Sequence, residues 1–408
     1  MGKTMLIIGL VWPEPTSSAA GWRMLQLIDL FLSEGYHIHF ACAASKSAYS
    51  FPLSSKGIIE QEILLNDSSF DVYVKELNPK IVLFDRFMVE EQYSWRVAQA
   101  CPDALRILDT EDLHFVRHAR QEAYKKGWDF NESLLFSDMA KREIASIYRS
   151  DLSLIISPEE IKILQEQFKV DSNILSYLPF QVLDSEGEKP DYRTRAHFMF
   201  IGNFLHEPNW KTVQILKEIL PSIRKKLPMA ELHIYGAYPS EKVWQLNNPK
   251  QGFKIMGRAD HAVATLKKYR ALLAPIPFGA GLKGKFIDAL SAGTPSVCSK
   301  IAVEGMETEL PWPGFVTDNM EEFVNNAVLL YQNEEQWNTC FQYGEQALQT
   351  LQDSDWGKEL IIQLDSIENN LENHRQRNFI GQILWTNQFL SSKYLSQWIE
   401  EKNKKAHP

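Results

Sequence analysis

The sequence predicts an α/β protein of two domains, each built on a parallel sheet. At 408 residues the chain is too long for one ordinary core and suits two domains of roughly 150 to 200 residues, with a cleft between them. Short apolar runs alternate with amphipathic segments along most of the chain, which is typical of βαβ units. A polar stretch at residues 184–191 interrupts this alternation with charged residues, glycine and proline, and is therefore our predicted interdomain linker.

In the first half, five apolar runs are predicted strands, at residues 5–11, 38–42, 80–84, 106–108 and 152–156. The clearest helix is predicted over residues 21–33, because its apolar side chains recur on one face and Gly35 follows as a C-cap. The same alternation resumes after the linker, with predicted strands at residues 198–201, 231–235, 253–256, 271–276 and 296–299. The two halves therefore share one architecture.

These patterns predict an N-terminal domain at residues 1–183, a second domain at residues 192–355, and a helical segment at residues 356–408 that crosses back to the first domain. The last segment carries apolar side chains that could lie on a membrane, although packing on the first domain is the simpler interpretation; they are Leu384, Trp385, Phe389, Leu390, Tyr394, Leu395 and Trp398.

Charge, hydropathy and cysteine content argue against several classes of function. The net charge of -9 repels polyanions and argues against nucleic acid as the main partner. The apolar stretch near the N-terminus lacks a signal-peptide cleavage pattern and is too short to cross a bilayer. The four cysteines are Cys42, Cys101, Cys298 and Cys340. Their spacing does not suggest a zinc site, and we expect each to be a small buried residue. This use of cysteine favours a reducing cytoplasm.

The most informative segment is a glycine-rich run at residues 277–295, which follows a predicted strand and enters a predicted helix. Glycines without a Cβ let backbone N–H groups approach a phosphate, and the start of a helix adds positive potential. Lys283 and Lys285 add matching charge, and Asp288 is placed to accept hydrogen bonds from ribose hydroxyls. The alternative is a glycine-rich turn with two solvated lysines and an aspartate favoured by the helix dipole.

Four segments in order resemble the donor domain of the GT-B glycosyltransferases of family 4, the large retaining family. They are residues 200–209 (FIGNFLHEPN), 232–237 (LHIYGA), 255–260 (IMGRAD) and 278–297 (FGAGLKGKFIDALSAGTPSV). The resemblance implies a GT-B fold, in which two Rossmann-like domains face a cleft, the first binding an acceptor and the second a nucleotide-sugar donor. It implies donor contacts at Gly202, Asn203, His206, Arg258, Gly281, Lys283, Gly284, Lys285 and Asp288.

Three positions depart from the family pattern. The family commonly has two glutamates separated by seven residues, and here these positions are Ala280 and Asp288. The arginine usual after the first glycine turn is replaced by Asn203. These departures suggest a subgroup in which Lys283 and Lys285 take over part of the contacts to the diphosphate and sugar.

The first half contributes catalytic candidates after the strand at residues 106–108. This segment resembles the family segment that faces the donor sugar, with Glu111 in place of the usual histidine and His114 three residues later. The resemblance makes Glu111 and His114 candidates for orienting the sugar or receiving the acceptor proton, with Lys283 stabilising the leaving diphosphate. The alternative is a helix N-cap at Asp109 or Asp112 with His114 on the surface.

Other residues are predicted to line the acceptor side of the cleft. The segment after the first strand resembles the family's acceptor loop, and a plain flexible turn is the alternative. The acceptor-side predictions are Ser18, Gly21, Arg23 and Asp109.

The expected activity is transfer of a sugar from a nucleotide-diphosphate sugar to a hydroxyl of a glycan, a lipid-linked or another acceptor. The resemblance implies retention of configuration and no metal or cofactor, in polysaccharide or glycoconjugate biosynthesis. A cytoplasmic location is expected, and Lys402, Lys404 and Lys405 beside the tail aromatics would suit a transient membrane contact. The alternatives are a GT-B nucleotide-sugar epimerase or hydrolase, and a non-catalytic subunit that binds nucleotide sugar.

Overall fold

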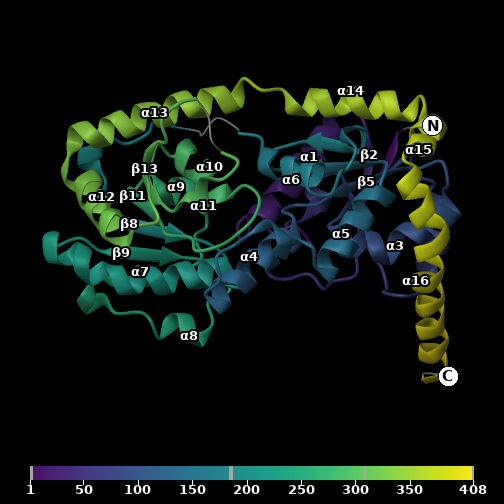
Figure 1. The fold of residues 1–408 in the computed structure, drawn as a ribbon, viewed down its shortest axis with the longest axis horizontal. Helices are drawn as coiled ribbons and strands as arrows, with labels where there is room; N and C mark the ends of the chain where they lie inside the picture. Colours follow the sequence, from purple (N-terminus) through teal and green to yellow (C-terminus); the bar gives the residue numbers. More distant parts are fainter. Residues whose placement is uncertain (1–2, 183–186, 307–308, 407–408) are drawn as a thin grey trace.

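The computed structural model describes residues 3–182, 187–306 and 309–406, which form two lobes, each built on a parallel sheet (Figure 1). The first sheet has the strand order β3-β2-β1-β4-β5-β6-β7 and the second has the order β10-β9-β8-β11-β12-β13. Both orders are those of the doubly wound Rossmann sheet, in which ligands bind at the carboxyl ends of the strands where the order reverses. The predicted α/β architecture is therefore confirmed.

The first sheet consists of β1 (Thr4–Gly9), β2 (His37–Cys42), β3 (Ile59–Glu62), β4 (Ile81–Asp85), β5 (Leu105–Asp109), β6 (Leu152–Ile155) and β7 (Leu175–Tyr177). Its connecting helices are α1 (Ala19–Ser33), α2 (Ser69–Leu77), α3 (Phe87–Ala100), α4 (His114–Lys126), α5 (Asp138–Arg149) and α6 (Pro158–Glu166). Short 3₁₀ turns are η1 (Leu53–Lys56), η2 (Glu132–Leu135) and η3 (Ser172–Ile174) in this lobe, then η4 (Tyr192–Thr194) and η5 (Pro249–Gln251) in the second.

The second sheet consists of β8 (Ala196–Ile201), β9 (Leu232–Tyr235), β10 (Phe253–Gly257), β11 (Tyr269–Ala274), β12 (Ser296–Cys298) and β13 (Gly314–Val316). Its helices are α7 (Glu207–Lys226), α8 (Glu241–Trp244), α9 (Ala262–Leu266), α10 (Gly284–Ser291), α11 (Lys300–Val303), α12 (Met320–Gln332) and α13 (Glu334–Gln352). The C-terminal helices are α14 (Trp356–Glu368), α15 (Leu371–Arg377) and α16 (Phe379–Ala406).

Every predicted strand is present, and the prediction missed β3, β7 and β13. Each missed strand lies at the edge of a sheet. An edge strand has only one neighbouring strand, so its sequence need not show the apolar run by which the other strands were predicted. The predicted helix at residues 21–33 begins two residues earlier, because the Ser18 hydroxyl accepts a hydrogen bond from the Gly21 N–H at 3.0 Å and caps α1. The four cysteines are buried, as predicted.

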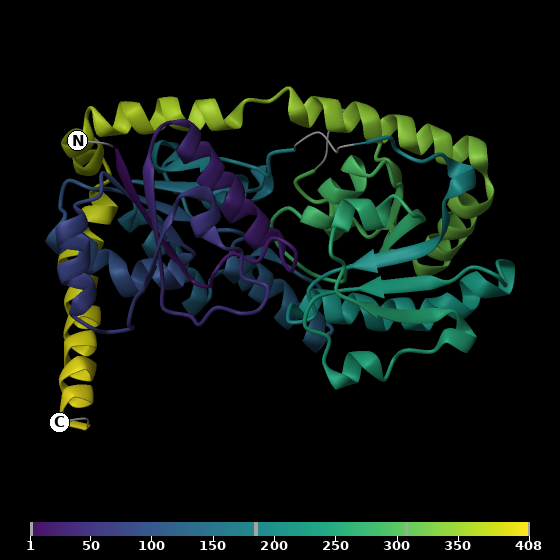
Figure 2. The ribbon, with the colours of Figure 1, turned by 180° about the vertical axis from the view of Figure 1, so that it is seen from behind.

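The C-terminal helices fasten the second lobe to the first. Helix α13 lies along the second lobe and α14 along the first, on the same side of the molecule (Figure 2). Leu360, Leu364 and Ile367 of α14 are buried in the core of the first lobe. Of the predicted linker, residues 184–186 lie outside the described residues, and Lys189 pairs with Glu345 of α13.

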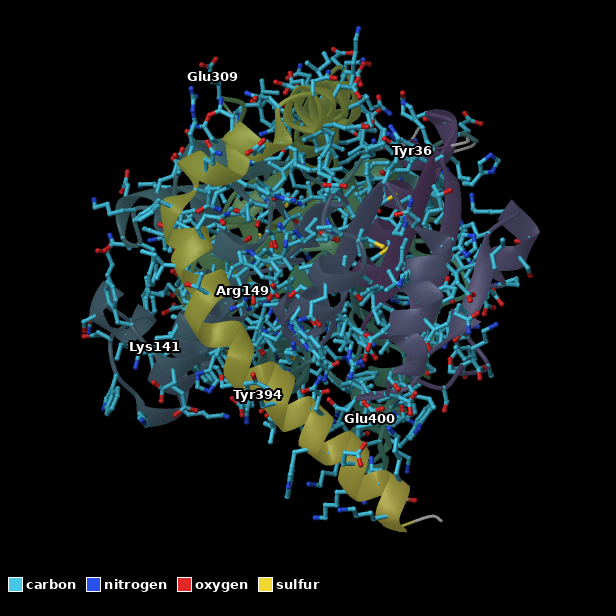
Figure 3. The ribbon with its side chains drawn as sticks, turned by 90° about the vertical axis from the view of Figure 1, so that its right-hand side faces the viewer. Tyr36, Lys141, Arg149, Glu309, Tyr394 and Glu400 are labelled. Carbon is cyan, nitrogen blue, oxygen red and sulfur yellow. The ribbon has the colours of Figure 1, made fainter. Side chains whose placement is uncertain are left out.

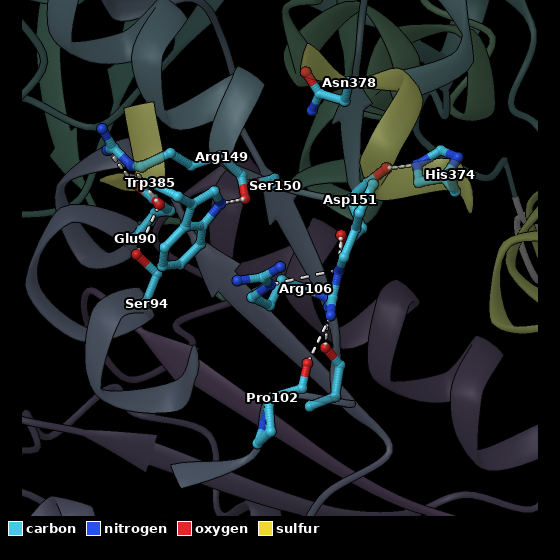
Figure 4. Close-up of polar contacts among 12 residues, drawn as sticks. Glu90, Ser94, Pro102, Arg106, Arg149, Ser150, Asp151, His374, Asn378 and Trp385 are labelled. Atoms are coloured by element: carbon cyan, nitrogen blue, oxygen red, sulfur yellow. Dashed lines mark hydrogen bonds and ion pairs between the residues drawn. The ribbon is translucent and has the colours of Figure 1, made fainter. Parts of the chain in front are cut away.

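Helix α16 packs against α5 and α3 of the first lobe (Figure 3). The Trp385 indole N–H donates to the Arg149 carbonyl at 3.1 Å, and its ring lies 4.3 Å from the Arg106 guanidinium (Figure 4). The predicted return to the first domain is therefore confirmed here, with Leu384 also packed on the core. The side chains of Phe389 and Leu390 lie outside the described residues, and an exposed set comprises Tyr394, Leu395 and Trp398.

Among the helices that the structure describes, none combines the length and the apolar character needed to cross a membrane.

Candidate functional site

A cleft of about 1200 Å³ lies where the carboxyl ends of the two sheets face each other. Residues after β1, β4, β5 and β6 line one wall, and residues after β8, β9, β10 and β11 line the other. This is the place where the strand order of doubly wound sheets leaves room for a ligand. The predicted site residues in its lining are Ser18, Glu111, His114, Gly202, Asn203, His206, Arg258, Lys283, Gly284, Lys285 and Asp288.

Three residues predicted on the acceptor side, Gly21, Arg23 and Asp109, lie outside the lining of the cleft as the structure describes it. Arg23 and Asp109 form a buried ion pair at 2.9 Å, with side chains 2% and 0% exposed, which ties α1 to the end of β5. The Arg23 guanidinium also donates to the Leu178 carbonyl at 2.6 Å. A Cβ on Gly21 would lie 2.5 Å from the backbone of Glu14, so this glycine lets the preceding loop fold onto α1. All three residues therefore have packing roles.

Two partly buried lysines stand at the start of α10 on the second-lobe wall. Lys283 is the N-cap residue, and its ammonium donates to the Gly281 carbonyl at 2.8 Å. Lys285 lies in the first turn, donates to Asn209 Oδ1 at 2.7 Å and sits 4.5 Å over the Phe200 ring. Burial lowers the pKa of Lys283 to about 8 and, with help from the charge of Lys283, that of Lys285 to about 7. An anion in the cleft would offset this cost of burying two positive charges.

Asp288 lies one turn into α10 and also lines the cleft. Burial raises the pKa of this carboxyl to about 7, although the neighbouring Lys285 opposes the change. Near neutral pH its oxygens can therefore both accept and donate hydrogen bonds, which suits contact with hydroxyl groups.

Asn209, which the sequence prediction did not select, organises the second-lobe wall. A Cβ on Gly202 would lie 2.5 Å from Asn209 Cγ, so only glycine at this position leaves room for the Asn209 side chain. The Asn209 amide donates to the Asn203 carbonyl at 2.9 Å while its oxygen accepts from Lys285. The signal was available in the Pro208-Asn209 pair at the start of α7, inside a segment already noted for its resemblance.

The glycines of the donor-side loop have a role that the sequence prediction did not foresee. A Cβ on Gly281, whose φ is +60°, would lie 2.8 Å from the Asp112 Cβ. A Cβ on Gly284 would lie 2.9 Å from the Ala19 Cβ. Asp112 and Ala19 belong to the first lobe, which packs directly on both glycines. A larger residue at either position would collide with it. Gly281 is therefore an interlobe contact and is not in the described lining of the cleft.

Glu111 faces the cleft from the first lobe in an unusual state. It has a φ of 60° although it is not glycine, and its side chain is 8% exposed. Among the described residues, Glu111 Oε1 is buried without a hydrogen-bond partner. Burial, reinforced by the neighbouring Asp109 carboxylate, raises the pKa of Glu111 to about 8. Backbone strain and an unpaired buried oxygen both concentrate at ligand-binding positions.

His114 begins α4 and is mostly buried, so the alternative of a surface histidine is wrong. The alternative of an N-cap at Asp109 or Asp112 is also wrong, because Glu143 of α5 accepts from the His114 and Phe115 N–H groups at 3.1 and 2.9 Å. His114 Nδ1 lies 3.0 Å from the Asp112 carbonyl, which can only accept. We therefore assign the proton to Nδ1, which makes Nε2 the basic nitrogen.

Ionisable side chains from both lobes line the cleft. Asp112 pairs with Arg117, and although burial opposes it, this arginine lowers the pKa of Asp112 to about 2. His206 lies on the opposite wall, where desolvation by the cleft, assisted by the charge of Arg117, lowers the pKa of its imidazole. In the described residues, no group of three or more His, Cys, Asp or Glu side chains is arranged to hold a metal ion.

Arg258 lines the cleft but turns toward the first lobe. Its guanidinium donates to Thr16 Oγ1 at 2.6 Å and lies 4.5 Å from the Tyr49 ring centroid. It also pairs with Asp260 at 3.0 Å. In this structure Arg258 therefore joins the two lobes at the rim.

Residues 195–333, the larger part of the second lobe, match the family model of the glycosyl transferases group 1. Comparison with curated protein sequences gives no significant match.

Solved structures show where the whole fold recurs. HepE from Anabaena, in complex with UDP and glucose, is 10% identical with a TM-score of 0.66, covering 89% of this chain and 100% of that one. Sucrose-phosphate synthase from Thermosynechococcus elongatus is 12% identical with a TM-score of 0.61, covering 91% and 99%. A TarM variant from S. aureus, in complex with fondaparinux, alpha-GlcNAc-glycerol and UDP, is 14% identical with a TM-score of 0.56, covering 73% and 58%.

This chain thus spans little more than half the length of that TarM variant. At these identities the similarity establishes the fold, which is GT-B.

Proposed function

We propose that this chain, which has the GT-B fold and matches group 1 glycosyl transferases over residues 195–333, transfers a sugar from a nucleotide-diphosphate sugar to an acceptor hydroxyl. The observation that carries the proposal is the pair of partly buried lysines at the start of α10, facing Glu111 and His114 across one cleft. The likeness of the fold to HepE, whose structure holds UDP and glucose, supports the same class of donor.

The donor would bind with its diphosphate at the start of α10. Backbone N–H groups at a helix N-terminus and ammonium groups both favour phosphate oxygens. Burial lowers the pKa values of Lys283 and Lys285, and a bound diphosphate would raise them again by favouring the charged form of both lysines. Asp288 would then contact the ribose hydroxyls.

In the transfer step, the bond from the anomeric carbon to the diphosphate oxygen breaks and the acceptor oxygen bonds to that carbon. Lys283, Lys285 and the α10 amides would stabilise the charge that develops on the leaving diphosphate. Glu111, which is protonated at neutral pH, would donate a hydrogen bond to a sugar hydroxyl, and His114 Nε2 would receive the acceptor proton. Retention of configuration and independence from metal belong to the proposal.

The acceptor is proposed to be a hydroxyl of a glycan or a lipid-linked glycan, in the biosynthesis of a polysaccharide or glycoconjugate. The cytoplasmic location and the transient membrane contact stay predictions. The exposed Tyr394, Leu395 and Trp398 on α16, with Lys402 5.3 Å over the Trp398 ring, are the surface that such a contact would use.

The deciding experiment measures binding of nucleoside diphosphates by calorimetry. We expect the double variant Lys283→Ala with Lys285→Ala to lose at least about a hundredfold in affinity, because two charge-assisted hydrogen bonds of about 1.5 kcal/mol or more are removed. The matched control is Lys225→Ala with Lys226→Ala, two exposed lysines at the far end of α7 in the same lobe, which should bind like the unaltered protein. Unchanged affinity in the first variant, with its thermal unfolding intact, would remove the basis of the proposal.

Incubation with nucleotide sugar alone separates the remaining alternatives. A transferase leaves the donor largely intact until an acceptor is added, whereas an epimerase or hydrolase changes it without one. Tight nucleotide binding without turnover on any acceptor would indicate a binding subunit. Product analysis by NMR would also report the anomeric configuration and thus test retention.

A further inference from the structure

Arg120 of α4 crosses from the first lobe to the second and makes three hydrogen bonds there. Its guanidinium donates to both carboxylate oxygens of Glu304, at 2.6 and 2.7 Å, and to the Gly279 carbonyl at 2.8 Å. The side chains of Arg120 and Glu304 are 11% and 24% exposed, so solvent screens this pair less than an ordinary surface ion pair. A bidentate contact between arginine and carboxylate of this kind fixes the relative orientation of the two side chains as well as their distance.

The segments joined by this contact both belong to the candidate site. Helix α4 begins at His114, and the Gly279 carbonyl belongs to the loop that ends in Lys283 and α10. The same helix makes a second contact with this loop, since the Tyr124 ring lies 5.2 Å from the Phe278 ring. Beside Glu304, a Cβ on Gly305 would lie 2.3 Å from the Ser157 hydroxyl of the first lobe. The lobes are therefore in close contact on both sides of the Arg120–Glu304 pair.

We infer that Arg120 is a positioning residue: by binding Glu304 and the Gly279 carbonyl, it holds the loop at residues 279–284 against the first lobe and fixes Glu304 beside Lys283. The inference rests on the proposed function, because the loop matters only if it binds the donor. It assigns a role to two residues that lie outside the predicted site.

The charges around Lys283 support this role. Burial is the main cause of its lowered pKa, Glu304 is the foremost charge that raises it, and Arg120 lowers it again. Glu160 and Asp112 of the first lobe add smaller favourable contributions, and Lys285 is its cationic neighbour. Glu304 thus pairs with Arg120 and also acts electrostatically on Lys283. Closure of the lobes would bring the loop into position and set the charge of Lys283 in one step.

The test compares Arg120→Met and Glu304→Gln with the unaltered full-length protein. Without ligand, small-angle X-ray scattering should show a larger radius of gyration for both variants, because the lobes separate. Nucleoside diphosphate affinity should fall about tenfold, and the KM for the donor should rise more than kcat falls. Arg120→Met should also shift the alkaline loss of nucleotide binding to higher pH, because Lys283 loses a cationic neighbour and keeps Glu304. A role in packing alone would not move this pH limit.

Arg193→Met is the matched control, because Arg193 pairs with Glu334 at 3.1 Å within the second lobe, and it should leave all these values unchanged. Exchange of charges, Arg120→Glu with Glu304→Arg, should recover part of the lost affinity. Unchanged scattering, affinity and pH limit in both Arg120→Met and Glu304→Gln would overturn the inference while leaving the proposed function standing. If the unaltered protein bound no nucleoside diphosphate, the proposed function would fail, and unchanged scattering would still overturn the contact's role in holding the lobes.

Discussion

The cleft holds ionisable side chains at positions where burial disfavours their charged forms. Burial raises the pKa values of Glu111 and Asp288 to about 8 and about 7 and lowers that of Lys285 to about 7. Clusters of such shifts are typical of functional sites, since the ligand supplies the missing partners. Replacing one of these residues should therefore change the free energy of unfolding measurably.

At this scale we predict that Glu111→Gln stabilises the protein above neutral pH while it slows transfer. The pKa of Glu111 in the folded protein is above its ordinary value of 4.5, so the unfolded chain releases this proton first and stability falls as pH rises from 4.5 to about 8. Glutamine has the same shape and does not ionise. Urea unfolding should show a gain of about 1–3 kcal/mol at pH 8 and a much smaller gain at pH 5. An equal gain at both pH values would contradict the assigned cause.

At the scale of elements, the start of α10 is shaped by the opposite lobe as much as by a ligand. Alanine would ordinarily stabilise a helix by about 1 kcal/mol relative to glycine. At position 284, however, the new methyl group would meet Ala19 of α1. The absence of a side chain at Gly284 therefore allows the two lobes to approach this closely.

We predict that Gly284→Ala weakens nucleoside diphosphate binding about tenfold by holding the lobes apart, without lowering the melting temperature. Adding Ala19→Gly should restore most of the affinity, because it removes the carbon atom that the new methyl group meets. Calorimetry on the two single variants and the double variant gives the coupling between the sites. Strictly additive effects would show that the two positions do not meet in solution.

At the scale of the whole molecule, the C-terminal helices are held on the first lobe by buried polar contacts (Figure 4). Arg375 of α15 binds both carboxylate oxygens of Asp151 at 2.8 Å, and it also donates to the carbonyls of Pro102 and Ala104. Asp151 is 3% exposed. Although burial opposes it, Arg106 and Arg375 together lower its pKa.

We predict that Arg375→Met destabilises the protein by about 3 kcal/mol at pH 7, because the buried carboxylate loses one of its two arginines. The loss should shrink as pH falls below the ordinary range of aspartate, since the pKa of Asp151 is depressed in the folded state and the pair stabilises only while it is ionised. Arg377→Met, at an exposed position on the same helix, is the control. Equal stability of the two variants in denaturant titrations would refute the assigned role of α15.

Sequence patterns alone predict the alternation of strands and helices, the helical C-terminal segment, and the placement of Lys283, Lys285 and Asp288 at the start of one helix. These features are local, because they depend on periodicity, on caps and on the order of residues within about twenty positions. The edge strands β3, β7 and β13 were missed because few neighbours constrain their side chains.

Which groups meet across the chain depends on how the elements pack in three dimensions. The Arg23–Asp109 pair spans 86 positions and the Arg120–Glu304 pair spans 184, and no local pattern marks either pair. Asn209 fills the space that Gly202 leaves, and the first lobe fills the space that Gly281 and Gly284 leave. A glycine in the sequence signals that something approaches closely, but what approaches depends on how the two sheets are placed. Burial, which shifts the pKa values of Glu111 and both lysines, likewise depends on segments that lie far apart in the sequence.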